Sequence, residues 1–73
     1  MEAWYSRDRR IMNFPVRLRG LRKQASLSLD QLAFLSGVSK AALSHLELGR
    51  RTPRWETVCK LANALKVSTE KFR

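Results

Sequence analysis

The chain has 73 residues and a formal net charge of +9, which describes one small, strongly basic domain. Such a charge predicts a polyanionic partner, either nucleic acid or an anionic membrane surface. A single cysteine excludes an internal disulfide, and with one histidine it cannot make a tetrahedral metal site, so we expect no metal and no cofactor. No apolar run approaches the roughly 20 residues of a membrane span.

Residues 1–13 have no clear hydrophobic period and are predicted to form an N-terminal arm or extension. They lack an apolar core of signal-peptide length, so we expect an intracellular protein. The segment mixes aromatic, basic and apolar side chains: Trp4, Tyr5, Arg7, Arg9, Arg10, Ile11 and Met12. The folded domain is predicted to comprise residues 14–73, where the pattern becomes helical.

The first predicted helix follows from apolar residues spaced along one face, namely Phe14, Leu18, Leu21 and Ala25. Asn13 is the expected N-cap, and Pro15 is tolerated in the first turn.

The second predicted helix has a strong start signal. Ser28 and Gln31 have the spacing of a capping box, in which each side chain accepts a hydrogen bond from the other residue's backbone N–H group. Leu27 and Leu32 flank this box at the positions of a hydrophobic staple. Gly37 should end the helix in a left-handed turn.

Three further helices are predicted. The third begins at the N-cap Ser39, turns Leu43 and Leu46 inward, and ends at Gly49. The fifth begins at Ser68, where Val67 and Phe72 repeat the staple arrangement. The fourth helix is expected to bury one face, made of Trp55, Val58, Cys59, Ala62 and Leu65.

No strand-like alternation occurs in the sequence, so the fold class is all-α, with four or five short helices around one core. Residues 31–47 contain two short helices joined by the small residues of 36–39, as a helix-turn-helix requires. The second helix of such a unit can lie in a DNA major groove. Its outward positions are short or polar: Lys40, Ala41, Ser44 and His45.

The sequence resembles the Cro/repressor-type helix-turn-helix domains between residues 18 and 72. The matching elements are Leu18-x-x-Leu21-Arg22, Ser28-x-x-x-Leu32-Ala33, Gly37-Val38-Ser39, Leu43-x-x-Leu46-Glu47-x-Gly49-Arg50-x-x-Pro53 and Leu61-Ala62-x-x-Leu65-x-Val67-Ser68. The resemblance implies a prokaryotic or phage protein of the cytoplasm that binds double-stranded DNA.

By this resemblance, residues 39–41, 44 and 45 fall where the family contacts DNA. Lys40 and His45 are the expected base readers, and Ala41 can touch a thymine methyl group. The resemblance also implies an ion pair between Arg22 and Glu47 that orients the recognition helix. Phosphate contacts are expected at two helix starts, in the basic loop and at the paired arginine: Ser28, Ser39, Arg50, Arg51 and Arg22.

Three features depart from the family pattern. Leu29 replaces a glutamine that often contacts phosphate. Arg54 replaces a capping residue, so Thr52 is expected to cap the fourth helix instead. Phe34 and Leu35 occupy positions that are usually polar, and we hypothesise that a second subunit or the apolar residues of the arm, Trp4, Tyr5, Ile11 and Met12, cover them.

These features predict a transcriptional regulator, in the first place a repressor that binds a palindromic operator as a homodimer. The alternative is an antitoxin or autoregulator that also binds a partner protein through Phe34, Leu35 and the aromatic arm. Arginines of the arm could also reach a minor groove.

The capping signals argue against a membrane-surface peptide, and no RNA-binding sheet motif occurs. We predict no enzymatic activity, because the chain lacks a nucleophile–base set, paired carboxylates and a phosphate-binding glycine loop.

Overall fold

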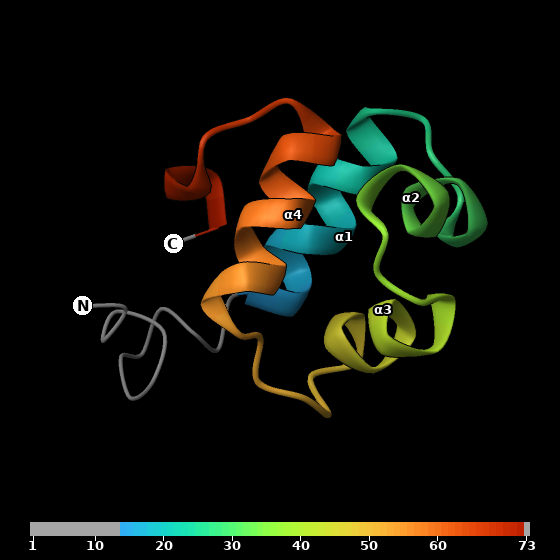
Figure 1. Cartoon of the computed structure of the whole chain (residues 1–73), viewed down its shortest axis with the longest axis vertical. Helices are drawn as coiled ribbons and strands as arrows, with labels where there is room; N and C mark the ends of the chain where they lie inside the picture. The colour runs from blue at the N-terminus through green and yellow to red at the C-terminus, as the bar shows by residue number, and fades with distance from the viewer. Residues whose placement is uncertain (1–13, 73) are drawn as a thin grey trace.

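A computed structural model describes residues 14–72. This part of the chain contains four α-helices, one 3-10 turn and no strand. The elements in chain order are α1 (Phe14–Gln24), α2 (Leu29–Ser36), α3 (Lys40–Glu47), α4 (Trp55–Leu65) and η3 (Thr69–Phe72). Helix α2 contacts both α3 and α4, α1 contacts α3, and η3 contacts α1 and α4. In Figure 1, α2 and α3 lie to the right of α4, with α3 below α2.

One hydrophobic core joins all five elements. Phe14, the first residue of α1, packs against Phe72 in η3 with ring centroids 5.2 Å apart, so the two ends of the described chain meet. This contact anchors the last turn of the chain to the first helix. The buried hydrophobic side chains are Phe14, Leu18, Leu32, Leu43, Leu46, Val58, Leu61, Ala62, Leu65 and Phe72.

The helix starts of the helix-turn-helix unit follow the sequence signals. The Oγ of Ser28 accepts from the Gln31 N–H at 3.0 Å, and the Gln31 Oε1 accepts from the Ser28 N–H at 2.8 Å. The predicted capping box is therefore confirmed. Ser39 caps α3 by accepting from the Ala42 N–H at 3.1 Å. Gly37 ends α2 with a φ of 76°, a left-handed conformation that glycine adopts without a Cβ penalty.

Helices α1, α3 and α4 all end in a left-handed residue. These residues are Ser26 (φ 59°), Gly49 (φ 75°) and Lys66 (φ 58°). In each case the next N–H group donates to a carbonyl five residues earlier, as Leu27 does to Arg22 at 3.1 Å. Ala25 is exposed in the turn after α1, so its predicted place on the buried face is wrong because the helix already ends at Gln24. The predicted cap Asn13 lies outside the described residues.

Two predictions for α4 are wrong. Arg54 is its N-cap and makes no side-chain capping bond, whereas Thr52 lies two residues earlier, before the rigid Pro53, and does not cap the helix. Cys59 is exposed rather than buried. At about 100° per residue, Cys59 points a quarter turn away from Val58, and Leu61 takes the core position.

The fifth helix is shorter than a full α-helix. It is the 3-10 turn η3, which contacts both α1 and α4. The Oγ of Ser68 accepts from the Glu70 N–H at 3.1 Å, so the predicted helix start is present, and Phe72 is fully buried. None of the described helices is long and apolar enough to cross a membrane.

Candidate nucleic-acid interface

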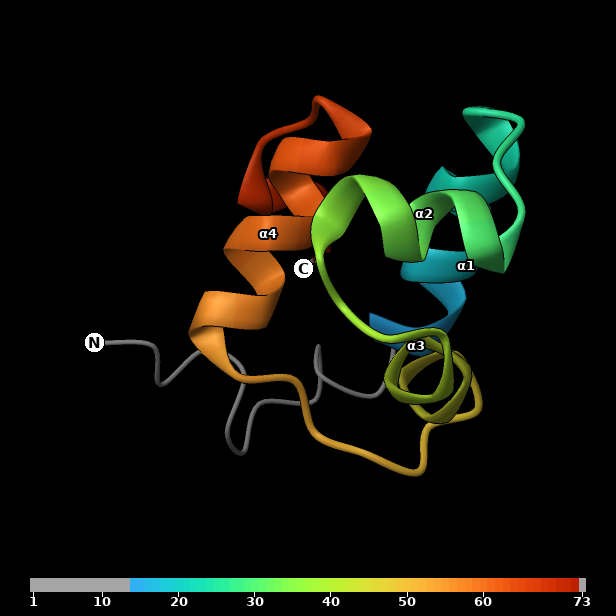
Figure 2. The same ribbon diagram turned by 45° about the vertical axis from the view of Figure 1, so that its right-hand side comes forward.

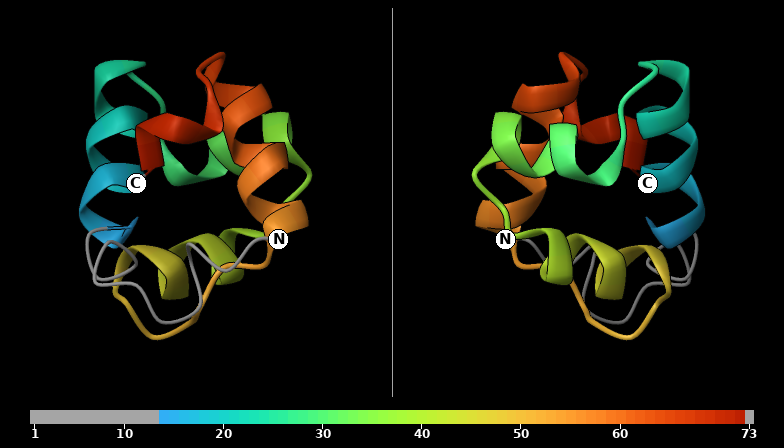
Figure 3. Two further views of the ribbon diagram at one scale, coloured as in Figure 1. Left: turned by 90° about the vertical axis from the view of Figure 1, so that its left-hand side faces the viewer. Right: turned by 90° about the vertical axis from the view of Figure 1, so that its right-hand side faces the viewer.

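Helix α3 lies along the outer edge of one end of the domain. Figure 2 shows it almost end-on, and Figure 3 shows it crossing below the other helices, with the loop to α4 beside it. Its inner side contacts α1 and α2 through Leu43 and Leu46, which are 0% and 3% exposed. The helix is therefore anchored along one side and open along the other.

The open side of α3 carries the residues that the sequence assigned to base contacts. Lys40, Ala41 and His45 are exposed, and Ser44 is partly buried. At about 100° per residue, Ala41 and His45 point almost directly away from Leu43. Lys40 and Ser44 lie on the flank of this surface, nearer to α1 and α2 than the other two.

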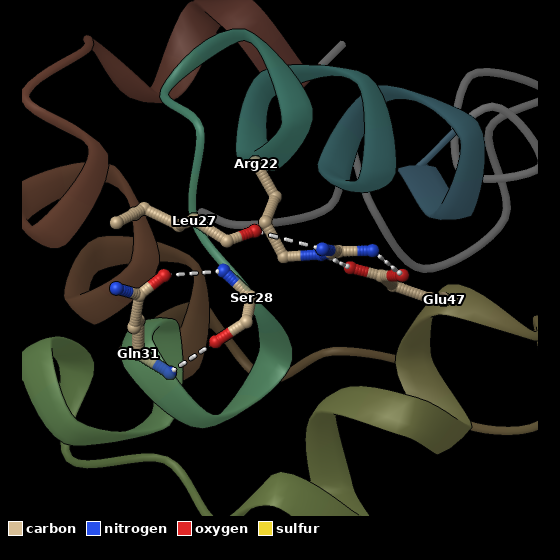
Figure 4. Close-up of polar contacts among 5 residues, drawn as sticks. All are labelled: Arg22, Leu27, Ser28, Gln31 and Glu47. Carbon is tan, nitrogen blue, oxygen red and sulfur yellow. Dashed lines mark hydrogen bonds and ion pairs between the residues drawn. The ribbon is translucent and has the colours of Figure 1, made fainter.

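Arg22 and Glu47 form an ion pair with two parallel hydrogen bonds, shown in Figure 4. The Arg22 Nε donates to Glu47 Oε2 at 2.7 Å, and Nη2 donates to Oε1 at 3.1 Å. The Arg22 Nη1 also donates to the Leu27 carbonyl at 2.8 Å. The two side chains are 12% and 9% exposed, so the pair is largely shielded from solvent. It ties the last turn of α3 to the last turn of α1.

The ion pair changes the pKa of Arg22 and fixes the orientation of its guanidinium group. The hydrogen bond that Arg22 donates to Glu47 raises the pKa of Arg22 above its ordinary value, although burial acts in the opposite direction. A planar guanidinium in a two-bond contact with a carboxylate holds one orientation, which lysine cannot do. Three of the five N–H groups of Arg22 are used here, and two are left for a further acceptor.

A family model described as a helix-turn-helix domain matches residues 14–73. The chain belongs to this family. It is similar to the HTH-type transcriptional repressor RghR of Bacillus subtilis, with 46% identity over 59 residues, which are 80% of this chain and 44% of that protein. The chain therefore spans less than half the length of this relative.

Two solved helix-turn-helix structures share the fold. The restriction-modification controller protein C.AhdI from Aeromonas hydrophila aligns with a TM-score of 0.81 and 36% identity, over 84% of this chain and 92% of that one. An HTH_3 family transcriptional regulator from Vibrio cholerae aligns with a TM-score of 0.80 and 42% identity, over 82% and 34%. The predicted family resemblance and all-α fold class are confirmed.

In this helix-turn-helix domain, the two N-cap serines use their hydroxyl groups within the fold. Ser28 caps α2 and Ser39 caps α3, and both side chains remain exposed. The backbone N–H groups of the first turn of such a helix have no intrahelical acceptor, and they point outward with the positive end of the helix dipole. A phosphate at either start would meet these groups together with the serine hydroxyl.

The loop after α3 supplies further positive charge. Arg50 and Arg51 are exposed in it, and Arg54 is exposed at the start of α4. Arg51 and Arg54 line a surface groove of about 260 Å³ whose other walls include Val38 and Pro53. From the sequence, Arg54 is only a departure from a capping residue, but its place beside Arg51 adds it to the basic surface around α3.

A second cleft, of about 290 Å³, opens beside the ion pair. It is lined by Arg19, Arg22, Leu29, Ser44, Glu47 and Leu48. Arg19 was not predicted as a site residue, although it precedes Arg22 by one helical turn and so shares its face. Leu29 packs against the core here, which explains how an apolar side chain fits at a position that the family often fills with glutamine.

Two apolar side chains of α2 stand apart from the interface. Phe34 is 87% exposed and Leu35 is 53% exposed. The arm residues that were expected to cover them lie outside the described residues, so that hypothesis stays a prediction. Within residues 14–72, no group of three His, Cys, Asp or Glu side chains is placed to hold a metal ion.

Proposed function

We propose that this domain binds double-stranded DNA in a sequence-specific manner and regulates transcription, with α3 in the major groove. The observation that carries the proposal is that α3 buries Leu43 and Leu46 while Ala41 and His45 face outward. Small and polar side chains on the open side let a helix approach base edges closely. Lys40 and His45 are the proposed hydrogen-bond donors to bases, and Ala41 and Ser44 fit against the adjacent edge.

The surroundings of α3 suit the phosphates on either side of a groove. The starts of α2 and α3, the loop residues Arg50 and Arg51, and the free N–H groups of Arg22 are the proposed phosphate contacts. Arg19, in the cleft beside Arg22, extends this set. Phosphate contacts position a protein on DNA and add salt-dependent affinity, whereas base contacts supply sequence preference.

The proposed assembly is a homodimer that acts as a repressor in the bacterial cytoplasm. The relative RghR is named a transcriptional repressor, and it comes from a bacterium. Two copies of α3 related by a two-fold axis would read half-sites about one helical turn apart, so the operator would be palindromic.

Selection of bound duplexes from a random pool, at near-physiological salt, tests the proposal. We expect enrichment of one palindromic sequence, called here the selected duplex, and a steep loss of affinity as salt rises. A duplex with the same composition in scrambled order is the control. Equal competition by the selected and scrambled duplexes would contradict sequence-specific binding.

The exposed Phe34 favours a second candidate function, in which α2 binds a partner protein and the domain is the antitoxin of a toxin–antitoxin pair. A side chain this apolar and 87% exposed is unusual on a free surface. Co-purification with one stoichiometric small protein, lost in Phe34→Ser but retained in the exposed-site control Val16→Ser, would support this candidate. Unchanged behaviour of Phe34→Ser in sedimentation and in co-purification would contradict it.

A further inference from the structure

The helix-turn-helix unit contains a second ion pair, at the opposite end of α3 from Glu47. The Nζ of Lys40 lies 3.4 Å from Oδ1 and 3.4 Å from Oδ2 of Asp30. Lys40 is the first residue of α3, and Asp30 lies in the first turn of α2, 10 positions earlier. The side chains are 58% and 75% exposed, so both are within reach of a bound ligand.

We propose that Asp30 is a specificity-determining residue that acts through Lys40. Its carboxylate holds the ammonium group away from DNA phosphates and lets it turn to a matching base edge. This inference rests on the proposed function, because it assigns a role within the same DNA-binding surface. Asp30 is a positioning residue here and does not itself contact a base.

The charges of α2 and α3 support this role. Lys40 is the only lysine or arginine in these two helices, and their two carboxylates are Asp30 and Glu47. Glu47 is engaged by Arg22 and largely buried. Asp30 is therefore the one exposed carboxylate at this surface, and it faces the only ammonium group there.

The chemistry of the ammonium group explains how the pair could discriminate between duplexes. An ammonium group has three N–H donors and no acceptor, so it can stay near a carboxylate while donating to a second group. Guanine presents two acceptors, N7 and O6, on its major-groove edge, and an ammonium group held in place can donate to them. A phosphate is an anion that the carboxylate repels, and it must compete with that carboxylate for Lys40. Asp30 should therefore weaken binding to unrelated DNA more than binding to the selected duplex.

The test is Asp30→Asn, which removes the charge and nearly preserves the shape. We expect its affinity for the scrambled duplex to rise about fivefold and its affinity for the selected duplex by no more than about twofold. The slope of log affinity against log salt on scrambled DNA should steepen by about 0.9, the contribution of one added phosphate contact. Asp30→Ser, which also suits a first helical turn, should behave in the same way. Thermal melting of each variant checks that the fold is kept.

Two controls separate action through Lys40 from general repulsion. Glu56→Gln removes the same charge at the second position of α4, and it should change the affinities for both duplexes by the same factor. In a Lys40→Ala background, Asp30→Asn should leave the ratio of the two affinities unchanged. The inference is overturned if Asp30→Asn still lowers the ratio of selected to scrambled affinity in the Lys40→Ala background. It is also overturned if Asp30→Asn leaves that ratio unchanged when Lys40 is present. If the parent itself does not discriminate between the duplexes, the proposed function fails instead.

Discussion

The two ends of α3 are held by ion pairs of very different character. At the C-terminal end, Glu47 accepts two bonds from Arg22 at 2.7 and 3.1 Å, and both side chains are about nine-tenths buried. At the N-terminal end, Lys40 and Asp30 approach only to 3.4 Å and are more than half exposed. The first pair joins α3 to α1, and the second pair spans the turn between α2 and α3.

The two pairs indicate which end of α3 is structural and which is free to exchange partners. A buried carboxylate without its cation is costly, so the pair at Glu47 resists separation. An exposed pair contributes little to folding because water and salt compete with it, so a ligand can replace it easily. Helix α3 is thus fixed in orientation at one end and chemically open at the other.

The largest expected effect is on stability at the fixed end. Glu47→Ala leaves the Arg22 guanidinium largely buried without its carboxylate, and we expect the free energy of unfolding to fall by about 3 kcal/mol. Urea denaturation followed by circular dichroism measures this loss. Arginine stays protonated below roughly pH 12, so its raised pKa adds no pH dependence near neutrality. A loss below about 0.5 kcal/mol would show that the pair contributes little to the fold.

The double variant Arg22→Met with Glu47→Leu is the matched control. It removes both charges together, so the uncompensated buried charge disappears and most of the stability should return. DNA binding should not return with it, because the two bonds that orient α3 and the proposed phosphate donor are both absent. Recovery of full affinity by the double variant would mean that α3 is oriented by core packing alone.

The next effect concerns the cap at the open end. Ser39→Ala removes the hydroxyl that accepts from the Ala42 N–H group, and we expect a loss of about 1 kcal/mol in the free energy of unfolding. Ser39→Asp keeps an acceptor at this position and should retain stability. It should weaken binding to every duplex, because it places a negative charge at a proposed phosphate contact. Equal stability of Ser39→Ala and the parent would contradict the capping role.

The local features of the fold were predictable because their signals lie within a few residues of each other. The capping box at Ser28 and the left-handed turn at Gly37 depend on neighbouring residues alone, and both are present as expected. Of the wrong predictions, Cys59 lies inside α4, a quarter turn from the buried face, and the other two arose at helix boundaries. Ala25 lies one residue after the end of α1, and Thr52 lies two residues before the N-cap of α4, so periodicity could not place them.

The site was only partly accessible from the sequence. The pairing of Arg22 with Glu47 came from a family resemblance, since nothing in a spacing of 25 residues brings two side chains together. The contact of Asp30 with Lys40 and the place of Arg19 in the cleft depend on how α2 and α1 pack against α3. Such contacts between helices follow from the crossing geometry, which hydrophobic patterning does not specify.

At the open end, Lys40→Ala should change stability by less than about 0.5 kcal/mol, because it removes an exposed and weak pair. Its effect should appear in recognition. We expect the affinity for the selected duplex to fall by about tenfold, with much less change for the scrambled duplex. His45→Ala should act in the same direction. Retention of the parent's sequence preference by both variants, measured by repeating the selection, would show that the reading surface lies elsewhere.

The smallest effect on both stability and preference is expected for Arg51→Ala, which tests the basic loop beside the open end. Arg51 is exposed, so its loss should leave the free energy of unfolding almost unchanged. A phosphate contact does not depend on base sequence, so the affinities for both duplexes should fall by the same factor. The slope of log affinity against log salt should become shallower by about 0.9. A change in the ratio of the two affinities would instead make Arg51 a base reader, and the division between a reading helix and a positioning loop would no longer hold.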